Sequence, residues 1–463
     1  MVVIGPVMAA WTRWKIRRLY NRSNWVDAHD LAKLHVNRKI NGEFAQDIVI
    51  RCFWNQGKWN EVIKFANKYP SEQHEKLAKR SAKKIAMQSE LERESVPRSI
   101  SHLVWNEENL LDNWYQEDHL VWMRHPWGWT HWVMPDDFTL SDVHPSLLSL
   151  ATNVLLKPWI PETVNIETPE REVGSKLALA FSGGVDSAAA AMLLPDDTIL
   201  AYHERSFPSL LSHDLPLRLF KQIEMRWNRN VMIIPSNHEK IRTIHGKQVG
   251  FSTDYAAGVH LILMADYLDL SGIAFGTPID NTWLQKGRKY RDFKDTWHWN
   301  YWRESFAKAG LHLVIPINHI SEAGALKICQ QSDLIDEINS CLRGDGDEYC
   351  GQCWKCFHKN GPLGRKIDPH SKEIQILLNK MPLRTAQHAL WAIQKLKLEH
   401  LVPHLSDELK SPLDWWEEAY RPGLELIQQP WRDIVQERTE KWLPYMQDEK
   451  MLQCVNLFPQ YPV

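Results

Sequence analysis

The most informative stretch of this sequence is Phe181-Ser182-Gly183-Gly184-Val185-Asp186-Ser187, which follows an apolar run and precedes the alanine-rich segment 188–194. The run Leu177–Phe181 predicts a buried strand, and the alanine-rich segment predicts a helix. Two adjacent glycines allow a tight turn and a close approach of the backbone to a ligand. Amide groups of such a turn and the positive end of the next helix favour an anion. The stretch therefore predicts a phosphate-binding loop.

Strand and helix patterns alternate around this loop. Further strands are predicted at 198–202, 231–234, 273–275 and 313–315, and helices near 187–194, 214–228, 254–268 and 300–309. This alternation predicts an α/β fold in which helices cover both faces of a parallel sheet. We assign residues 173–370 to that domain.

Ligands of open α/β sheets bind at the carboxyl ends of the strands. Residues after the second and fourth predicted strands therefore join the candidate site: Tyr202, His203, Arg205, Gly276 and Asp280.

Four of the seven cysteines are close together in the sequence. Cys341, Cys350, Cys353 and Cys356 form the pattern C-x8-C-x2-C-x2-C. Four thiolates can close a tetrahedron around zinc and leave no position for water, so the pattern predicts a structural zinc site. An iron–sulfur cluster is the main alternative. The other cysteines are predicted to be packing residues: Cys52, Cys329 and Cys454.

The loop 181–187 lacks the Gly-Lys-Ser/Thr of a Walker A motif, and it resembles the Ser-Gly-Gly-x-Asp-Ser loop of the N-type ATP pyrophosphatases. Members of that superfamily have a Rossmann-like fold and cleave ATP between the α- and β-phosphates. The resemblance implies that Ser182, Gly183, Gly184 and Ser187 bind pyrophosphate, while Asp186 supports the loop or its Mg²⁺. We further expect Tyr202 and Gly276 to contact ATP, and Asp186, Ser187 and Arg205 to act in catalysis.

Together, the loop and the cysteine spacing resemble the 7-cyano-7-deazaguanine synthases over residues 174–366. In that family a carboxylate is adenylated and ammonia then displaces AMP. Tyr290–Lys294 partly matches a family segment. Two features depart from the family pattern. Glu322 replaces a lysine expected near phosphate, so another lysine must substitute (candidates Lys286, Lys289 and Lys327), and Gly250–Asp254 replaces an Arg-Asn substrate segment.

The predicted function is an ATP-dependent carbon–nitrogen ligase that uses Mg²⁺ and ammonia or an amine. The resemblance implies that its substrate is a 7-carboxy-7-deazaguanine-like or related carboxylate, which is a small molecule or is presented by a protein. Two alternatives remain open. One is a tRNA-thiolating enzyme, which needs a reactive cysteine near ATP. The other is a non-catalytic ATP-sensing scaffold. The family resemblance also suggests a homodimer.

Residues 1–104 contain an internal repeat. Trp25, Ala28, Leu31 and Ala32 recur 34 residues later as Trp59, Val62, Phe65 and Ala66, with Gly57 at the predicted turn. This period resembles tetratricopeptide-type helix pairs, which commonly bind a protein partner. A helical bundle without a partner remains the alternative. The segment holds 19 Lys and Arg against 10 Asp and Glu, which favours an acidic partner.

The remaining segments give fewer signals. Residues 105–172 predict a Trp-rich module with a β-hairpin around 126–128 and a helix over 145–156, and residues 371–463 predict a helical region. The 55 basic and 57 acidic residues of the whole chain nearly cancel, which predicts no polyanion partner from net charge. No apolar run reaches the roughly 20 residues that span a bilayer, so we expect no membrane partner and a cytoplasmic protein.

Overall fold

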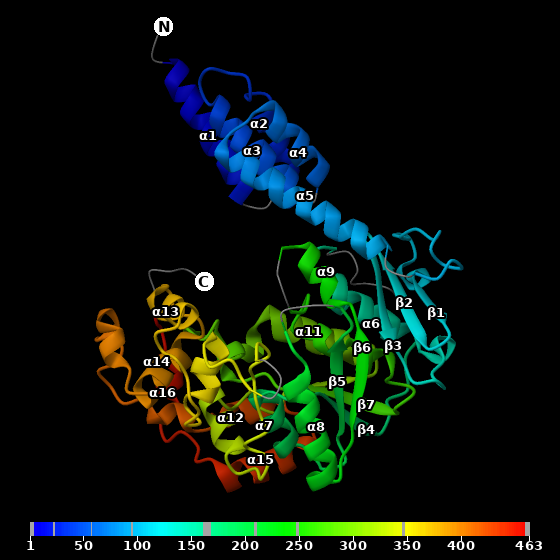
Figure 1. The fold of residues 1–463 in the computed structure, drawn as a ribbon, viewed down its shortest axis with the longest axis vertical. Coiled ribbons are helices and arrows are strands. Elements are labelled where there is room, and N and C mark those ends of the chain that lie inside the picture. The colour runs from blue at the N-terminus through cyan, green and yellow to red at the C-terminus, as the bar shows by residue number, and fades with distance from the viewer. Residues whose placement is uncertain are drawn as a thin grey trace. The chain divides into compact units, whose positions relative to one another are not determined.

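The computed structural model describes residues 4–21, 24–56, 58–93, 96–160, 168–207, 211–246, 250–344 and 348–458. The chain forms two compact units, which are described separately (Figure 1). The first contains residues 1–103 with the short segments 124–129 and 243–247, and the second contains the rest.

The first unit is a stack of helices. Its helices are α1 (Ile4–Asn21), α2 (Trp25–Lys33), α3 (Gly42–Asn55), α4 (Trp59–Lys68) and α5 (Glu72–Arg93). Trp25 and Trp59 each begin a helix, α2 packs against α3, and α4 packs against α5. Five of the eight repeat positions are buried, namely Ala28, Ala32, Trp59, Val62 and Ala66, and the other three are partly buried. Gly57, the expected turn residue, lies outside the described residues.

Trp59 does not pack only within the repeats. It forms a small apolar cluster with Ile244, against which Trp127 also packs. The hairpin tip and the end of α9 (Glu239–Ile244) therefore belong to the core of the first unit.

The second unit is built on one eight-stranded sheet. Its strands are β1 (Trp114–Glu117), β2 (Leu120–His125), β3 (Gly128–Val133), β4 (Lys176–Ala180), β5 (Ile199–Arg205), β6 (Val231–Ser236), β7 (Leu270–Phe275) and β10 (His312–Val314). Their order is β1-β2-β3-β6-β5-β4-β7-β10. The five strands from β6 to β10 are parallel, and β3 joins β6 antiparallel. The fold is therefore α/β, with a mostly parallel sheet.

The strand order places the loop 181–187 at a special point of the sheet. The chain builds outward from β4 to β5 and β6, and then crosses back to add β7 and β10 on the other side. The loop follows β4, so it lies where the order reverses, which is where open α/β sheets bind ligands.

Helices cover the parallel strands on both faces, as predicted. All six residues of β7 are buried, which requires cover on each side. One group packs around α7 (Val185–Leu193), and it comprises α12 (Glu322–Cys329) and α15 (Trp431–Trp442). A second group packs around α6 (Pro145–Leu156), and it comprises α10 (Val259–Leu263) and α11 (Trp297–Lys308) (Figure 1). Helix α8 (Asp214–Trp227) contacts β6.

One expected element differs from the structure, and one small ladder was not expected. The helix predicted over 254–268 is broken into a 3-10 turn, Ala256–Gly258, and the short helix α10. The short strands β8 (Leu284–Gln285) and β9 (Lys289–Tyr290) form a separate small ladder that sequence patterning did not indicate.

The region after residue 371 is helical, with α13 (Lys372–Asn379), α14 (Ala386–Lys395), α15 and α16 (Lys450–Gln453). It is bound closely to the α/β core at His319. The amide of Tyr420 donates to the His319 carbonyl at 2.7 Å, and the His319 ring lies 2.9 Å from the Thr439 hydroxyl. A Cβ on Gly423 would meet the His319 side chain at 2.6 Å. The backbone at Gly423 therefore packs directly against the side chain of His319.

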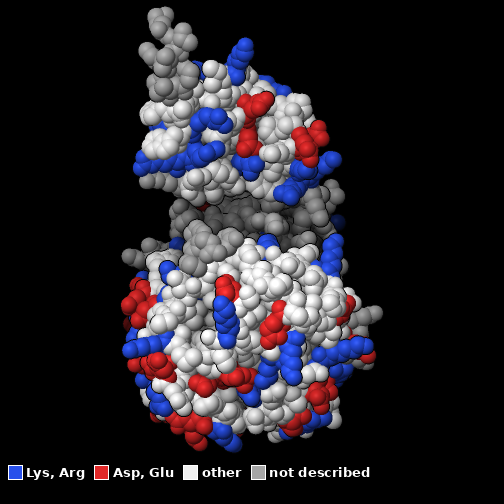
Figure 2. All heavy atoms as spheres, turned by 90° about the vertical axis from the view of Figure 1, so that its left-hand side faces the viewer, with Lys and Arg blue, Asp and Glu red and all other residues white. Residues whose placement is uncertain are grey.

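Both units carry charged side chains at the surface. In α1 the basic side chains Arg13, Lys15, Arg17 and Arg18 are exposed. Figure 2 shows basic and acidic side chains on the visible face of both units. Within the described residues, no helix combines the length and apolar character needed to cross a bilayer.

Candidate phosphate-binding site and cysteine cluster

The loop between β4 and α7 is closed by its own serines. The Ser187 hydroxyl accepts from the Ser182 amide at 3.2 Å and lies 3.0 Å from the Ser182 hydroxyl. Gly183 has a φ of +72°, and a Cβ there would meet the Phe220 ring at 3.3 Å. Glycine is therefore required at this position by both conformation and space.

The first turn of α7 presents amides to the site. The amide of Val185 donates to the Ser340 hydroxyl at 3.0 Å, while those of Asp186 and Ser187 have no acceptor among the described residues. Unpaired amides at a helix N-terminus, together with the helix dipole, favour a bound anion. The loop thus has the donors that its sequence predicts.

Gly276, which follows β7, lies directly against this turn. A Cβ at this position would approach the Asp186 carbonyl oxygen at 2.9 Å and the Ser187 Cα at 3.0 Å. Because glycine has no side chain, the backbone that follows β7 can pack directly against the loop backbone at Gly276.

A buried ion pair meets the loop from the other side. The ammonium of Lys359 lies 2.7 Å from Oδ1 of Asp186 and 2.9 Å from Oε2 of Glu322. Burial alone would lower the pKa of Lys359, but the two carboxylates more than offset it and hold this pKa above its usual value. For Asp186 the effects are reversed: burial raises the pKa of its carboxyl group, and Lys359 lowers it.

Glu322 is ionised in this arrangement. Burial would raise its pKa, yet Lys359 and the rings of His388 and His358 together hold it well below the usual value. Its amide donates to Oδ2 of Asp280 at 2.8 Å, which connects Asp280 to the same cluster. Glu322 is therefore paired with a cation, so it does not face the loop as an unpaired negative charge.

The cation beside Glu322 is not one of those expected from the sequence. Lys327 instead pairs with Glu417 at 3.0 Å, and Lys289 lies exposed in β9. Lys359 lies beside Glu322 because the segment after the cysteines folds back onto α7, which linear spacing does not reveal.

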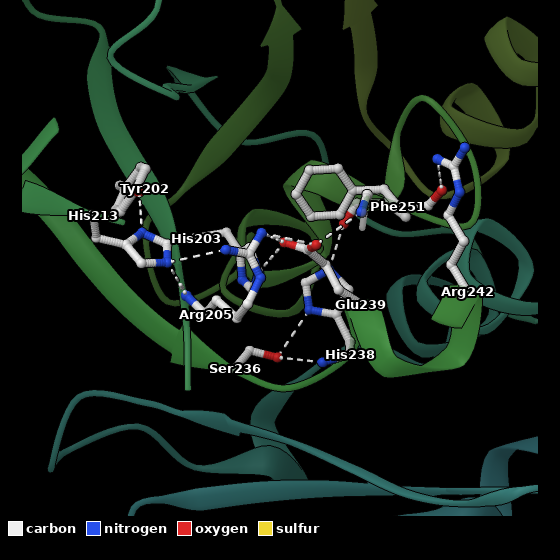
Figure 3. A network of polar contacts seen from close by, with 11 residues as sticks. Tyr202, His203, Arg205, His213, Ser236, His238, Glu239, Arg242 and Phe251 are labelled. Carbon is white, nitrogen blue, oxygen red and sulfur yellow. Dashed lines mark hydrogen bonds and ion pairs between the residues drawn. The ribbon is translucent and has the colours of Figure 1, made fainter. Parts of the chain in front are cut away.

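Tyr202 and Arg205 belong to a second network at the end of β5 (Figure 3). Arg205 makes two hydrogen bonds to Glu239, at 2.7 and 2.9 Å, and the Tyr202 hydroxyl is hydrogen-bonded to the His213 ring. His203 also contacts Glu239, at 3.2 Å. The structure brings together the loop serines and glycines, Asp186, Gly276 and Asp280, whereas Tyr202, His203 and Arg205 form this separate network.

Glu239 organises the neighbouring loop. Burial would raise its pKa, but His203 and Arg205 hold it well below its usual value, so it is ionised. It also accepts from the Gly250 amide at 3.0 Å, and Arg242 donates to the Phe251 carbonyl at 2.5 Å. This anchoring fixes the start of the segment 250–254. Tyr290 lies elsewhere, with its hydroxyl 3.3 Å from that of Tyr420.

The four clustered cysteines converge on one point. Their sulfur atoms are 3.5 Å (Cys341–Cys350), 3.9 Å (Cys341–Cys353), 3.8 Å (Cys350–Cys356) and 3.6 Å (Cys353–Cys356) apart. Zinc–sulfur bonds of about 2.3 Å in a tetrahedron give edges of about 3.8 Å. The cluster can thus hold a single metal ion, and its dimensions fit zinc.

The cysteine cluster is directly connected to the loop. Ser340, which bonds the Val185 amide, precedes Cys341, and Lys359 follows Cys356 by three residues. Of the remaining cysteines, Cys52 and Cys329 are buried as predicted, whereas Cys454 is exposed, so the prediction that it is a packing residue is wrong.

Comparison with known proteins identifies one family. The model of a family of unknown function (DUF6395) matches residues 301–456, so the chain is similar to that family from α11 to α16. The matched part contains Glu322, the four cysteines and Lys359, but not the loop 181–187. No curated protein matches the chain.

Sequence reasoning missed three kinds of contributor to this site: the hydroxyl of Ser340, the ammonium of Lys359, and the buried rings of His358 and His388. A signal was present in part, because Lys359 and His358 follow the cysteine motif within three residues. Nothing in the sequence pattern connects His388 to them.

Proposed function

We propose that this protein is an ATP pyrophosphatase of the N-type (PP-loop) class that adenylates a carboxylate and transfers ammonia or an amine to it. The observation that carries the proposal is the closed serine–glycine loop at the switch point, with unpaired α7 amides and Lys359 beside it. The amides at the start of α7 suit the pyrophosphate part of ATP, because they place partial positive charge where negative charge develops as pyrophosphate leaves.

In the proposed reaction, a carboxylate oxygen attacks the α-phosphorus of ATP, and the bond to the bridging oxygen breaks with release of pyrophosphate. Ammonia or an amine then attacks the acyl carbon, loses a proton to solvent, and displaces AMP. Asp186 is the loop carboxylate that would contact Mg²⁺, which enters with ATP and neutralises its phosphates. The serines and amides of the loop would orient the polyphosphate.

Zinc in the cysteine cluster would have a structural role in this proposal. A full thiolate shell leaves no position for a substrate. A four-iron cluster is larger than one ion and would hold its thiolates farther apart, so the short sulfur–sulfur distances favour zinc over iron–sulfur.

Thiolation of tRNA has weaker support. Burial raises the pKa of Cys329, near the loop, to about 12, and its thiol donates to the Val185 carbonyl. A thiol of that kind stays protonated and unreactive. The second alternative is an ATP-sensing scaffold without catalysis, and an activity assay distinguishes it from the proposed enzyme.

The test is ATP–pyrophosphate exchange with a panel of carboxylates, together with identification of the nucleotide product. AMP and pyrophosphate are expected, and Asp186→Asn is expected to reduce their formation by more than 100-fold. ADP and phosphate as products would contradict the class. Tight ATP binding without exchange for any acceptor would favour the scaffold.

A further inference from the structure

Beside Lys359, three ligand-type side chains from three elements converge. Glu322 begins α12, His358 lies in the turn Cys356–Asn360, and His388 lies in α14. Oε2 of Glu322 lies 3.7 Å from Nε2 of His388 and 4.0 Å from Nδ1 of His358. One ligand atom from each of the three lies within 4.8 Å of the other two.

The two histidines have ring nitrogens that the protein does not satisfy. Both rings are 0% exposed. Neither nitrogen of His358, nor Nδ1 of His388, has a hydrogen-bond partner within the described residues. Leaving a buried polar group unpaired is costly, so three such nitrogens in one place indicate that something else contacts these rings. Each neutral imidazole has one nitrogen with a lone pair that a metal can bind.

We infer that Glu322, His358 and His388 bind one transition-metal ion of the zinc type, separate from the cysteine site. Two imidazole nitrogens and one carboxylate oxygen are a common ligand set for such ions. Mg²⁺ and Ca²⁺ prefer all-oxygen shells and fit less well. Nε2 of His388 lies 3.0 Å from the His358 carbonyl, so when Nε2 donates this bond the nitrogen open to the metal is Nδ1, which has no partner among the described residues. A hydrogen bond of this kind orients a metal-binding imidazole.

Lys359 is compatible with an ion at this place. Glu322 and Asp186 both contact this single ammonium, so Lys359 is shared between two carboxylates. A carboxylate has two oxygens with about four acceptor positions, so Glu322 can serve both Lys359 and the metal. The metal, Glu322, Lys359 and Asp186 then form a continuous link to the phosphate loop. The site itself does not depend on the proposed function.

The test is the metal content of the full-length protein, saturated with Zn²⁺ and dialysed. Two zinc ions per chain are expected. His388→Gln, which keeps the volume and removes the imidazole, is expected to retain one. His260→Gln, in which an equally buried histidine of α10 is changed, is the matched control and should retain two. A wild-type value of one, or a value of two for His388→Gln, would overturn the assignment.

A second measurement requires no variant to fold. In a Co²⁺ titration of the metal-free wild-type chain, the cysteine site gives intense near-ultraviolet thiolate charge-transfer bands. The proposed site has no sulfur, so a further equivalent should add visible bands without increasing the thiolate bands. Saturation at a single equivalent, or two equivalents that both increase the thiolate bands, would refute a nitrogen–oxygen site.

Discussion

The Nζ atom of Lys359 lies 2.7 Å from Oδ1 of Asp186, although 173 positions separate the two residues in the chain. This contact joins the turn after the last clustered cysteine to the first turn of α7. Ser340, on the other side of the cysteines, bonds the Val185 amide in the same turn. The segments on both sides of the cysteine cluster therefore hold the loop 181–187 and the start of α7 at two points.

The buried ion pair should matter more for stability than a comparable exposed pair. Lys359→Met leaves Asp186 and Glu322 without their cation, and loss of one partner of a buried pair costs about 3–5 kcal/mol. Lys327→Met, which breaks a half-exposed pair with Glu417, should cost at most about 1 kcal/mol. Urea unfolding measures both changes.

The same measurement can show that charge is the cause. Adding Glu322→Gln to Lys359→Met removes one of the orphaned carboxylates, so the double variant should be more stable than the sum of the two single effects predicts. Equal losses for Lys359→Met and Lys327→Met would contradict a buried pair.

Gly276→Ala should impair nucleotide binding more than folding. The new Cβ would meet the Asp186 carbonyl oxygen at 2.9 Å and displace the α7 turn, at a cost of about 1–3 kcal/mol. We expect at least a roughly tenfold weaker Kd for ATP, measured by calorimetry. Gly364→Ala is the control, because its Cβ would meet nothing within 4 Å and only its positive φ is strained. Unchanged ATP affinity in Gly276→Ala would argue against phosphate binding at this loop.

Loss of the metal from the cysteine cluster should weaken both the fold and the loop. Cys353→Ser is expected to lower the melting temperature of the second unit by several degrees, because metal-binding free energy contributes to folding. It should also weaken ATP binding, since Ser340 and Lys359 lose their shared anchor. Cys454→Ser, at an exposed position, should change neither property. Normal ATP binding by a metal-free chain would show that the loop does not need the cluster.

The stability of the second unit should fall in mild acid. Burial lowers the pKa of His260 and of His319 to about 3, compared with about 6.5 in an unfolded chain. Between pH 6.5 and 3 the unfolded state binds more protons, so stability is lost as the pH decreases, by up to about 1.4 kcal/mol per pH unit for each group. Melting temperatures at pH 7, 6 and 5 measure the slope.

A single substitution tests the source of that slope. His260→Gln should make the pH dependence shallower, and His404→Gln, at an exposed position, should leave it unchanged. An identical slope in His260→Gln would show that the buried imidazole is not responsible.

The α/β class, the five parallel strands and the loop after β4 were predictable because local sequence patterns specify each of them. A buried apolar run, two glycines and a run of alanines specify strand, turn and helix within 18 residues, from Leu177 to Leu194. Helix α6 was predicted at its observed limits for the same reason, since Pro145 marks its start.

The partners of the loop were not predictable in this way. The contact of Lys359 with Asp186 depends on how the chain folds back after the cysteines, and the contacts of Arg205 depend on where Glu239 lies in α9. Lys359 and Arg205 are charged, and charged side chains are usually exposed to solvent. They are buried because the fold places carboxylates of opposite charge beside them.

The 173-residue interval between Asp186 and Lys359 has a consequence for synthesis of the protein. At about 5–20 residues per second, the ribosome adds Lys359 roughly 10–35 seconds after Asp186. During that time the serine–glycine turn can already have left the ribosome, while Ser340, the cysteines and Lys359 are still to be made. A nascent or prematurely ended chain therefore has the loop 181–187 without the contacts of Ser340 and Lys359. If the loop binds ATP as proposed, binding should begin only after the carboxyl-terminal half has folded.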